Sequence, residues 1–521
     1  MNTIFFEGFT TTFATDEVDN NLDPNYWVKM QGTGVVATHP RLDPGGWADG
    51  GQGSIDDAKY NMYRLTPHDK TDTTSTVDRV YAGQGVLSLT NFPVDISGVV
   101  DGSDNFVASG IGVGFYINKL ASEPSGINDV DDYSQRLLKI YNSEFDDPGS
   151  DVAGLKAASG VIEIDVVHSP GTAGYGNTTT DPRNLSLRVR TPNANADGWV
   201  NKYYDVNVLG SVWNYLQPNQ ETNYTRDDQR IISTFIEDTN NDNTYGGDDY
   251  YNGLFVEISI LSNGTNGVAD PYEMQIRLNG MNIFEHGLTQ DDQTLTGLVS
   301  HFNQTNVKYF DRIDWFGSRT GVLPHNETDN SNVDNDYTWI DDIYIIANSG
   351  TGVALTHNDN FLGASTKVYS LFPSATGINV DNSWRAFDAD SGFDDIENAE
   401  VEYLKTDDGD NQYIYAENND KFMMFDFDNI ELDPALNINN YIIGGIKITN
   451  SSRKVSKDVS FQNAFASGTD LTNPTAIAQE FYVTGTTYEY QNQYIMDNPL
   501  TNQKWTTTDI NDGHFGIVKR S

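Results

Sequence analysis

Two carboxylates spaced two residues apart form the feature of this sequence that comes closest to a catalytic motif. Glu163 and Asp165 lie in the run 160–168, in which apolar and polar residues alternate. Because alternate side chains of a β-strand lie on the same face, both carboxylates are expected to point the same way. Hydrolysis of a glycosidic bond with retention needs two carboxyl groups roughly 5 Å apart. An ordinary strand with two polar positions facing a groove or solvent is the alternative, and it is the interpretation that we prefer.

The same run resembles the catalytic strand of the laminarinase-type β-glucan hydrolases, which are lectin-like sandwiches. The resemblance implies that Glu163 is a nucleophile assisted by Asp165, and that a second Glu just downstream is the acid/base. That Glu is missing, because Val167 and His168 follow. A histidine can carry protons, but the residue that the family uses is lost. We therefore predict that the chain is not an enzyme, and a polysaccharide hydrolase stays the alternative.

A loop rich in Asp and Asn is the candidate metal site. Oxygen ligands at alternate positions, followed by a later acidic residue, approximate the calcium loop of an EF-hand; these are Asp238, Asn240, Asp242 and Asp249. Asn243 replaces the usual glycine of such a loop, and no helix is expected on either side. The sequence therefore leaves two interpretations open, a calcium site and a solvated polar loop.

Aromatic residues in expected loops are the candidate carbohydrate-binding residues. Trp47, Trp199, Tyr250 and Tyr251 could stack on sugar rings while neighbouring Asp and Asn side chains bind hydroxyl groups. The alternative is that a given Trp is part of the core, as most Trp residues of a β-sandwich are.

Short alternating runs along the whole chain predict an all-β protein. Typical examples are 111–117, 185–190 and 254–260, and Asn279-Gly280 predicts a hairpin turn. The glycines of 110–114 fall inside such a run, so they predict a strand and not a dinucleotide-binding loop. We predict a sandwich domain at 1–348, a linker rich in turn residues at 349–360, and a second antiparallel β-sandwich domain at 361–521.

Composition excludes several classes of function. The 521 residues carry a net charge of −44, which repels nucleic acid and anionic membrane surfaces. The chain has no cysteine, so neither disulfides nor thiolate chemistry are expected. The first residues contain no basic leader followed by an apolar run, and no stretch is apolar for the length of a membrane span. We expect synthesis in the cytoplasm of a host cell, folding without disulfides, and release by a route other than a signal peptide.

The ends of the first predicted domain resemble those of concanavalin A-like (laminin G-like) jelly-rolls. The resemblance rests on the opening residues 5–9, on Tyr26-Trp27, on the segment 310–317 and on the closing run 339–345. It implies that the last strand of the domain returns beside the first one.

The junction and the C-terminal part are similar to structural proteins of tailed bacteriophages. The shared pattern runs through 341–345, 360–363, 367–373, Trp384, 444–448, 453–454 and 498–517. It implies a virion protein, such as a tail-associated appendage, a fibre or a head decoration, on the exterior of the particle. We expect other virion proteins as partners, a homo-oligomer (a trimer is our prediction) and contact with a host glycan. A secreted carbohydrate-binding protein is a further alternative.

Overall fold

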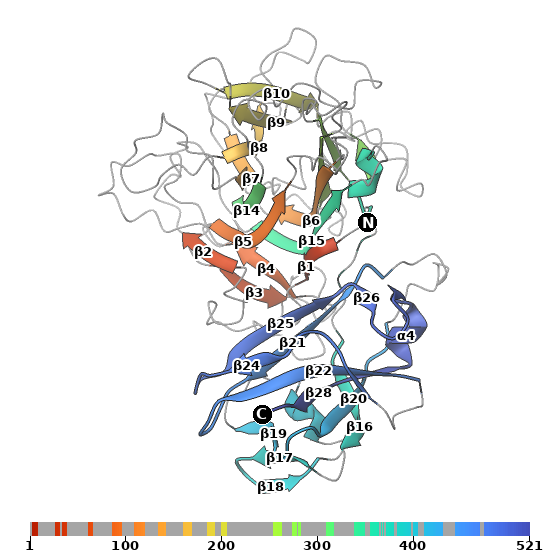
Figure 1. Cartoon of the computed structure of the whole chain (residues 1–521). Helices are drawn as coiled ribbons and strands as arrows, with labels where there is room; N and C mark the ends of the chain where they lie inside the picture. The colour runs from red at the N-terminus through yellow and green to blue at the C-terminus, as the bar shows by residue number, and fades with distance from the viewer. Residues whose placement is uncertain are drawn as a thin grey trace, which may run out of the picture. The chain divides into compact units, whose positions relative to one another are not determined.

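The computed structural model describes strands throughout the chain and most of its last 150 residues. The described residues are 3–8, 27–31, 34–38, 61–65, 86–95, 109–119, 134–141, 160–168, 185–192, 199–205, 254–262, 273–278, 280–282, 309–316, 338–349, 355–363, 366, 368, 371–379, 383–396, 400–404, 411–430, 443–468 and 474–521. They belong to two compact units, whose main continuous parts are Met62–Lys367 and Val368–Ser521. Both units are built almost wholly from antiparallel strands (Figure 1), so the predicted all-β class is confirmed.

Two antiparallel sheets form the first unit. The described strands of one sheet are, in spatial order, β13 (Met281–Asn282), β12 (Glu273–Leu278), β11 (Leu254–Ser262), β6 (Ser109–Lys119), β15 (Thr338–Ser349), β4 (Asn61–Leu65) and β3 (Gly34–Thr38), with β1 (Thr3–Glu7) also on β15. The other contains β10 (Trp199–Asp205), β9 (Leu185–Pro192), β8 (Gly160–His168), β7 (Ser134–Tyr141), β14 (Tyr309–Phe316), β5 (Val86–Asp95) and β2 (Trp27–Gln31). We call them the eight-stranded and the seven-stranded sheet of the described part.

The core of the first unit lies between these sheets. Every second residue of β6, including Val113 and Phe115, is buried on the inner face of the eight-stranded sheet. Phe115 meets Trp315 of the seven-stranded sheet edge to face, with ring centroids 5.9 Å apart. Strand β1 pairs with β15, and Phe6 lies opposite Tyr344. The expected return of the last strand beside the first is therefore confirmed.

The segment that follows β15 packs on the outer face of the eight-stranded sheet. Its described part, residues 355–363, contains the short 3-10 helix η6 (His357–Asn360), and we call these residues the strap. Asn360 is fully buried, and a Cβ atom on Gly112 of β6 would lie 2.0 Å from its backbone oxygen. The prediction of a linker at 349–360 is wrong for residues 355–360, which pack on the sheet. Glycines of β6, which have no side chain, let the backbone of the strap approach closely. The two units divide after Lys367.

The second unit is built around a six-stranded sheet in its described part. Its strands are β16 (Pro373–Asn379), β20 (Phe422–Phe427), β28 (Gly513–Lys519), β22 (Val459–Ser467), β23 (Thr475–Ala476) and β24 (Phe481–Val483). The further elements are β17 (Trp384–Asp388), β18 (Gly392–Asp395) and β19 (Gln412–Ala416), the pair β21 (Ile446–Ser452) and β25 (Glu489–Ile495), the pair β26 (Asp497–Asn498) and β27 (Gln503–Lys504), η8 (Glu400–Leu404) and α4 (Thr507–Asn511).

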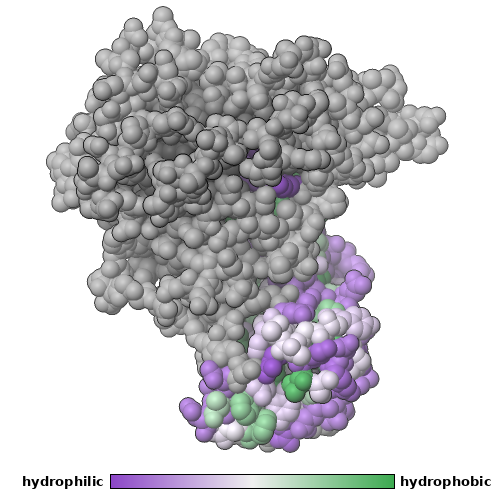
Figure 2. Space-filling view, turned by 90° about the vertical axis from the view of Figure 1, so that its left-hand side faces the viewer, coloured by the Kyte–Doolittle hydropathy of each residue, from purple (hydrophilic) through white to green (hydrophobic). Residues whose placement is uncertain are grey.

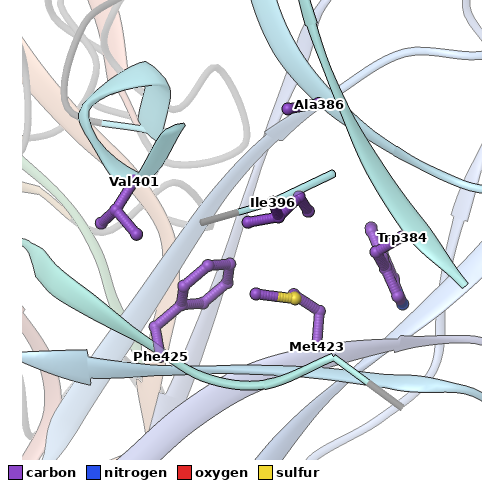
Figure 3. Close-up of a cluster of buried hydrophobic side chains, with 6 residues drawn as sticks. All are labelled: Trp384, Ala386, Ile396, Val401, Met423 and Phe425. Carbon is purple, nitrogen blue, oxygen red and sulfur yellow. The ribbon is translucent and has the colours of Figure 1, made fainter. Parts of the chain in front are cut away.

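Two buried clusters hold this second layer against the six-stranded sheet. On the face that Figure 2 shows, hydrophilic residues cover much of the described surface of the second unit, with smaller apolar patches between them. One cluster (Figure 3) joins Trp384 and Ala386 of β17 to Met423 and Phe425 of β20. The other packs Trp505 edge to face on Phe465, with ring centroids 5.1 Å apart. Among the described residues, no helix is long and apolar enough to cross a membrane.

Candidate functional site

Charged positions cross the outer face of the seven-stranded sheet in two rows. Strand pairing sets opposite one another, strand after strand, Ser88, Asp314, Lys139, Glu163, Arg190 and Asn201 in the first row. The second row contains Arg136, Asp165, Arg188 and Tyr203. Their neighbours along the strands, such as Ile313, Leu138 and Ile164, are buried on the core side. We call these ten positions the polar rows.

The best-defined charges of the polar rows are held firmly in place. Asp314 is 1% exposed and Lys139, its register partner on the adjacent strand, is 3% exposed. Arg312 donates to both carboxylate oxygens of Asp314, from Nε at 2.8 Å and from Nη2 at 2.7 Å. Such a two-pronged pair fixes both groups in position and direction. The charge of Asp314 is therefore already balanced within the protein.

The balance of charge in the polar rows differs from that of the chain. Four positions are basic and three are acidic, whereas the whole chain has 31 basic and 75 acidic residues. Glu163 has Lys139 and Arg190 on its two sides, and Asp165 has Arg136 and Arg188. Opposite charges on neighbouring strands stabilise a sheet, and a row of alternating basic and acidic positions also suits hydroxyl and carboxylate groups of a ligand.

The strand that carries the carboxylate pair was predicted correctly. Glu163 and Asp165 lie in β8 at alternate positions, as expected. The pairing adds the basic residues on both sides of each carboxylate, which the sequence did not indicate, because they come from strands far away along the chain. Position 167, next on this face, is Val and lies opposite Ser134 and Ser186.

Most of the other candidate residues lie outside the described residues. This holds for Trp47, Tyr250 and Tyr251, and for the predicted calcium ligands Asp238, Asn240, Asp242 and Asp249. Trp199 is described in its backbone and begins β10 opposite Pro192, so it lies in a strand and not in a loop. Among the described residues no group of three or more acidic, His or Cys side chains is arranged to hold a metal ion.

A second polar cluster, which sequence reasoning missed, lies beneath the strap. Glu257 of β11 is fully buried, and its Oε1 accepts hydrogen bonds from the Tyr344 hydroxyl at 2.6 Å and from the Gly363 backbone at 2.7 Å. The Tyr344 oxygen in turn accepts from the backbone of Leu362 at 3.1 Å. Burial, with the nearby charge of Glu257, raises the pKa of Tyr344, so this hydroxyl remains a donor.

The strap contributes its own polar side chains to that cluster. His357 Nδ1 lies 2.8 Å from the hydroxyl oxygen of Ser259, and its Nε2 is 3.9 Å from Glu273, too far for a hydrogen bond. Burial, together with the charge of Arg277, lowers the pKa of His357 to about 4, so the ring is neutral at pH 7. The Arg277 guanidinium lies over the ring of Phe361, 4.0 Å from its centroid. These contacts fasten the strap, and the cluster is structural.

Comparisons with known proteins give no family for this chain. No family model matches, and no curated protein matches either. Among solved structures, an endo-β-1,4-glucuronan lyase from Trichoderma reesei is 10% identical, covers 66% of this chain and 95% of its own, and has a TM-score of 0.28. A seed lectin of Lotus tetragonolobus is 10% identical over 66% of this chain and 98% of its own, with a TM-score of 0.26. An alginate lyase from Klebsiella pneumoniae is also 10% identical, over 64% and 98%, with a TM-score of 0.26.

Proposed function

We propose that this chain is a structural protein of a bacteriophage particle that contacts an anionic glycan through the polar rows of its first unit. The observation that carries the glycan contact is the register of β7, β8 and β9, which sets the basic positions Arg136, Arg188 and Arg190 beside the acidic positions Glu163 and Asp165. Asp314 and Lys139 are buried, so they do not count toward a contact with a polymer. Of the five other charged positions of the polar rows three are basic and two are acidic, which favours a ligand with carboxylate or sulfate groups. The net charge of −44 repels such a ligand from the rest of the chain.

The place on a particle is supported by the residues of the phage-like pattern. Three of them, Asn360, Trp384 and Trp505, are 0%, 3% and 2% exposed. Buried residues such as these determine how the strap and the second unit fold. A sequence pattern shared at these positions therefore supports a shared fold. The acidic surface agrees with an exterior position, away from packaged DNA. A tail-associated appendage, a fibre and a head decoration all fit this proposal.

The glycan contact is tested with a polymer and its uncharged counterpart. Polygalacturonate and its carboxyl-reduced form have the same backbone, so a difference in binding reports the carboxylates. We expect the chain to bind polygalacturonate and not the reduced polymer, with binding weakened by salt. The double variant Arg188→Gln, Arg190→Gln should lose roughly tenfold or more in affinity. Equal binding of both polymers, by the unaltered chain and by the double variant alike, would show that the polar rows do not bind the glycan.

A matched control separates binding from stability. Lys504 and Arg520 are also basic and form exposed ion pairs with Asp497 and Asp420 in the second unit. Neutralising both to Gln removes the same charge from the chain and should leave binding unchanged. Melting curves of both double variants show whether the sheet needs Arg188 and Arg190 for folding. A large loss of melting temperature in Arg188→Gln with Arg190→Gln, without loss of binding by the folded variant, is expected if these charges only stabilise the sheet.

The place on the particle has its own test. Mass spectrometry of purified particles of the phage that encodes the chain should find it in a fixed ratio to the major capsid protein. Its absence from particles would refute the structural role and leave the glycan contact, which is the property of a secreted carbohydrate-binding protein. Absence of catalysis remains a prediction, and release of reducing ends from a panel of polysaccharides, abolished by Glu163→Gln, would contradict it.

A further inference from the structure

Four aromatic rings share the outer face of the three-stranded sheet in the second unit. They are Phe387 of β17, Phe393 of β18, and Tyr413 and Tyr415 of β19, which we call the aromatic grid. The register places Phe393, Phe387 and Tyr413 side by side across the three strands. Neighbouring centroids in this row are 4.9 Å apart, and Tyr415 lies 5.7 Å from Phe393. The alternate residues Trp384 and Ala386 are buried in the core on the other face.

The aromatic grid is apolar and its surroundings are acidic. Phe393 is 70% exposed, one of four exposed large hydrophobic residues among those described. At the strand ends lie Asp388, Asp390 and Glu417, and Asp395 is in register with Arg385, the single basic residue of the three strands. Burial and the charge of Glu417 both raise the pKa of Tyr415. The other three rings are half-buried and surround the exposed Phe393. An apolar patch at the surface marks an interaction site, and its acidic edge favours a partner with positive charge.

The same unit presents a surface of opposite character. The turn between β21 and β22, residues 453–458, holds three basic residues, Arg453, Lys454 and Lys457, against one acidic residue, Asp458. We call it the basic turn. At its tip Val455 is 82% exposed, the most exposed large hydrophobic residue described. Arg453 is held over the ring of Tyr488, and Lys454 pairs with Asp458 at 2.6 Å. An apolar tip flanked by cations thus matches the acidic edge of the aromatic grid.

We propose that the basic turn of one copy of the chain docks on the aromatic grid of a second copy. The argument for the basic turn as the partner is its charge. The chain as a whole carries −44, so two copies repel one another except where a locally basic surface meets an acidic one. Val455 then covers Phe393, which removes two exposed apolar side chains from water. Lysine ammonium groups near the four rings add cation–π attraction.

This contact is heterologous, because it joins two different surfaces. A heterologous contact that repeats by rotation closes into a ring, such as the trimer expected from the sequence, and otherwise it continues as a filament. Each copy then offers one aromatic grid and one basic turn. The inference is independent of glycan binding, so either can fail without the other.

Complementary variants of the full chain test the contact. Phe393→Ser with Tyr413→Ser removes the grid surface, and Lys454→Glu with Lys457→Glu reverses the charge of the turn. Arg453 is left in place because it packs on Tyr488. We expect the unaltered chain to assemble beyond the dimer in sedimentation velocity, and each double variant to lose affinity for itself by roughly tenfold or more. Tyr482→Ser, at a side chain 64% exposed on β24, is the matched control and should assemble normally.

A mixture of the two double variants gives the sharper result. One variant keeps an intact turn and the other an intact grid, so a single productive contact is left and the mixture should stop at a dimer containing one of each. Assembly of either double variant like the unaltered chain overturns the proposal. So does a monomeric unaltered chain, or a mixture that stays monomeric. Circular dichroism and melting curves must match those of the control variant, and a variant that fails this check is replaced by Val455→Asp on the turn or Phe393→Asp on the grid.

Discussion

The hydroxyl of Tyr344 fastens the strap to the eight-stranded sheet, and its removal has a predictable cost. In Tyr344→Phe the ring stays in its buried place, but two hydrogen bonds are lost: the one donated to Glu257 at 2.6 Å and the one accepted from the Leu362 backbone at 3.1 Å. Glu257 is fully buried, and its Oε2 already has no hydrogen-bond partner among the described residues. After the substitution, Oε1 of Glu257 keeps the hydrogen bond that the Gly363 backbone donates to it.

The magnitude follows from these contacts. A hydrogen bond to a charged group contributes about 1.5 to 3 kcal/mol, and a buried donor left without a partner costs about 1 to 3 kcal/mol. Relaxation of the strap and entry of water recover part of this, so we expect local opening of residues 355–363 to become easier by about 3 kcal/mol. That corresponds to exchange of the strap amides about 100-fold faster.

Hydrogen exchange followed by mass spectrometry measures the effect in each unit separately. Peptides that cover 355–363 should lose protection in Tyr344→Phe, while those of β20 and β28 in the second unit should keep theirs. Tyr482→Phe, which removes an equivalent hydroxyl from a side chain 64% exposed, should change neither set. Unaltered protection of the strap, or an equal loss in both units, would refute the view that this hydroxyl holds the strap.

Three further predictions concern the first unit. Gly112→Ala should release the strap, because the new Cβ would lie 2.0 Å from the Asn360 backbone oxygen; limited proteolysis after residue 349 should become faster, and an unchanged rate would contradict it. The pKa of His357 is lowered to about 4, while an unfolded His titrates near 6.5, so the unfolded state binds the extra proton between these values. Stability of the first unit should be full above about pH 6.5 and fall by up to about 3 kcal/mol as the pH drops to 4; urea unfolding at several pH values should show this slope, and His357→Gln should flatten it. At the Asp/Asn loop we expect millimolar calcium to raise the melting temperature of the chain, and Asp238→Asn with Asp242→Asn to abolish the rise; a rise that persists in the variant would place the ion elsewhere.

Strand positions were predictable because alternation is a local property. The runs 111–117, 185–190 and 254–260 all lie in strands, and β1 and β15 pair as the jelly-roll resemblance implied. The partners of Glu163 could not be predicted, because Lys139 and Arg190 come next to it only through the order of strands in the sheet. Strand order depends on contacts far apart in the sequence, and one sequence contains little information on them.

The strap lies where local turn propensity predicts a linker, for a related reason. Turn-forming residues such as Asn348, Gly350 and Gly352 indicate flexibility when only local propensity is considered. The signal that could have corrected this lay far upstream, in the alternating glycines of 110–114. Glycines on one face of a strand indicate that another backbone approaches closely, and here that backbone is the strap. The polar character of Asn360 and His357 then reflects buried hydrogen bonds with Ser259.

The most direct test of the glycan contact is titration of the chain with polygalacturonate and with its carboxyl-reduced form, measured by calorimetry at low and at physiological salt. We expect the chain to bind the anionic polymer alone, and this binding to be weakened by salt and by Arg188→Gln with Arg190→Gln but unaffected by Lys504→Gln with Arg520→Gln. Binding of the reduced polymer with equal affinity, or loss of binding in the control variant to the same extent, would contradict it.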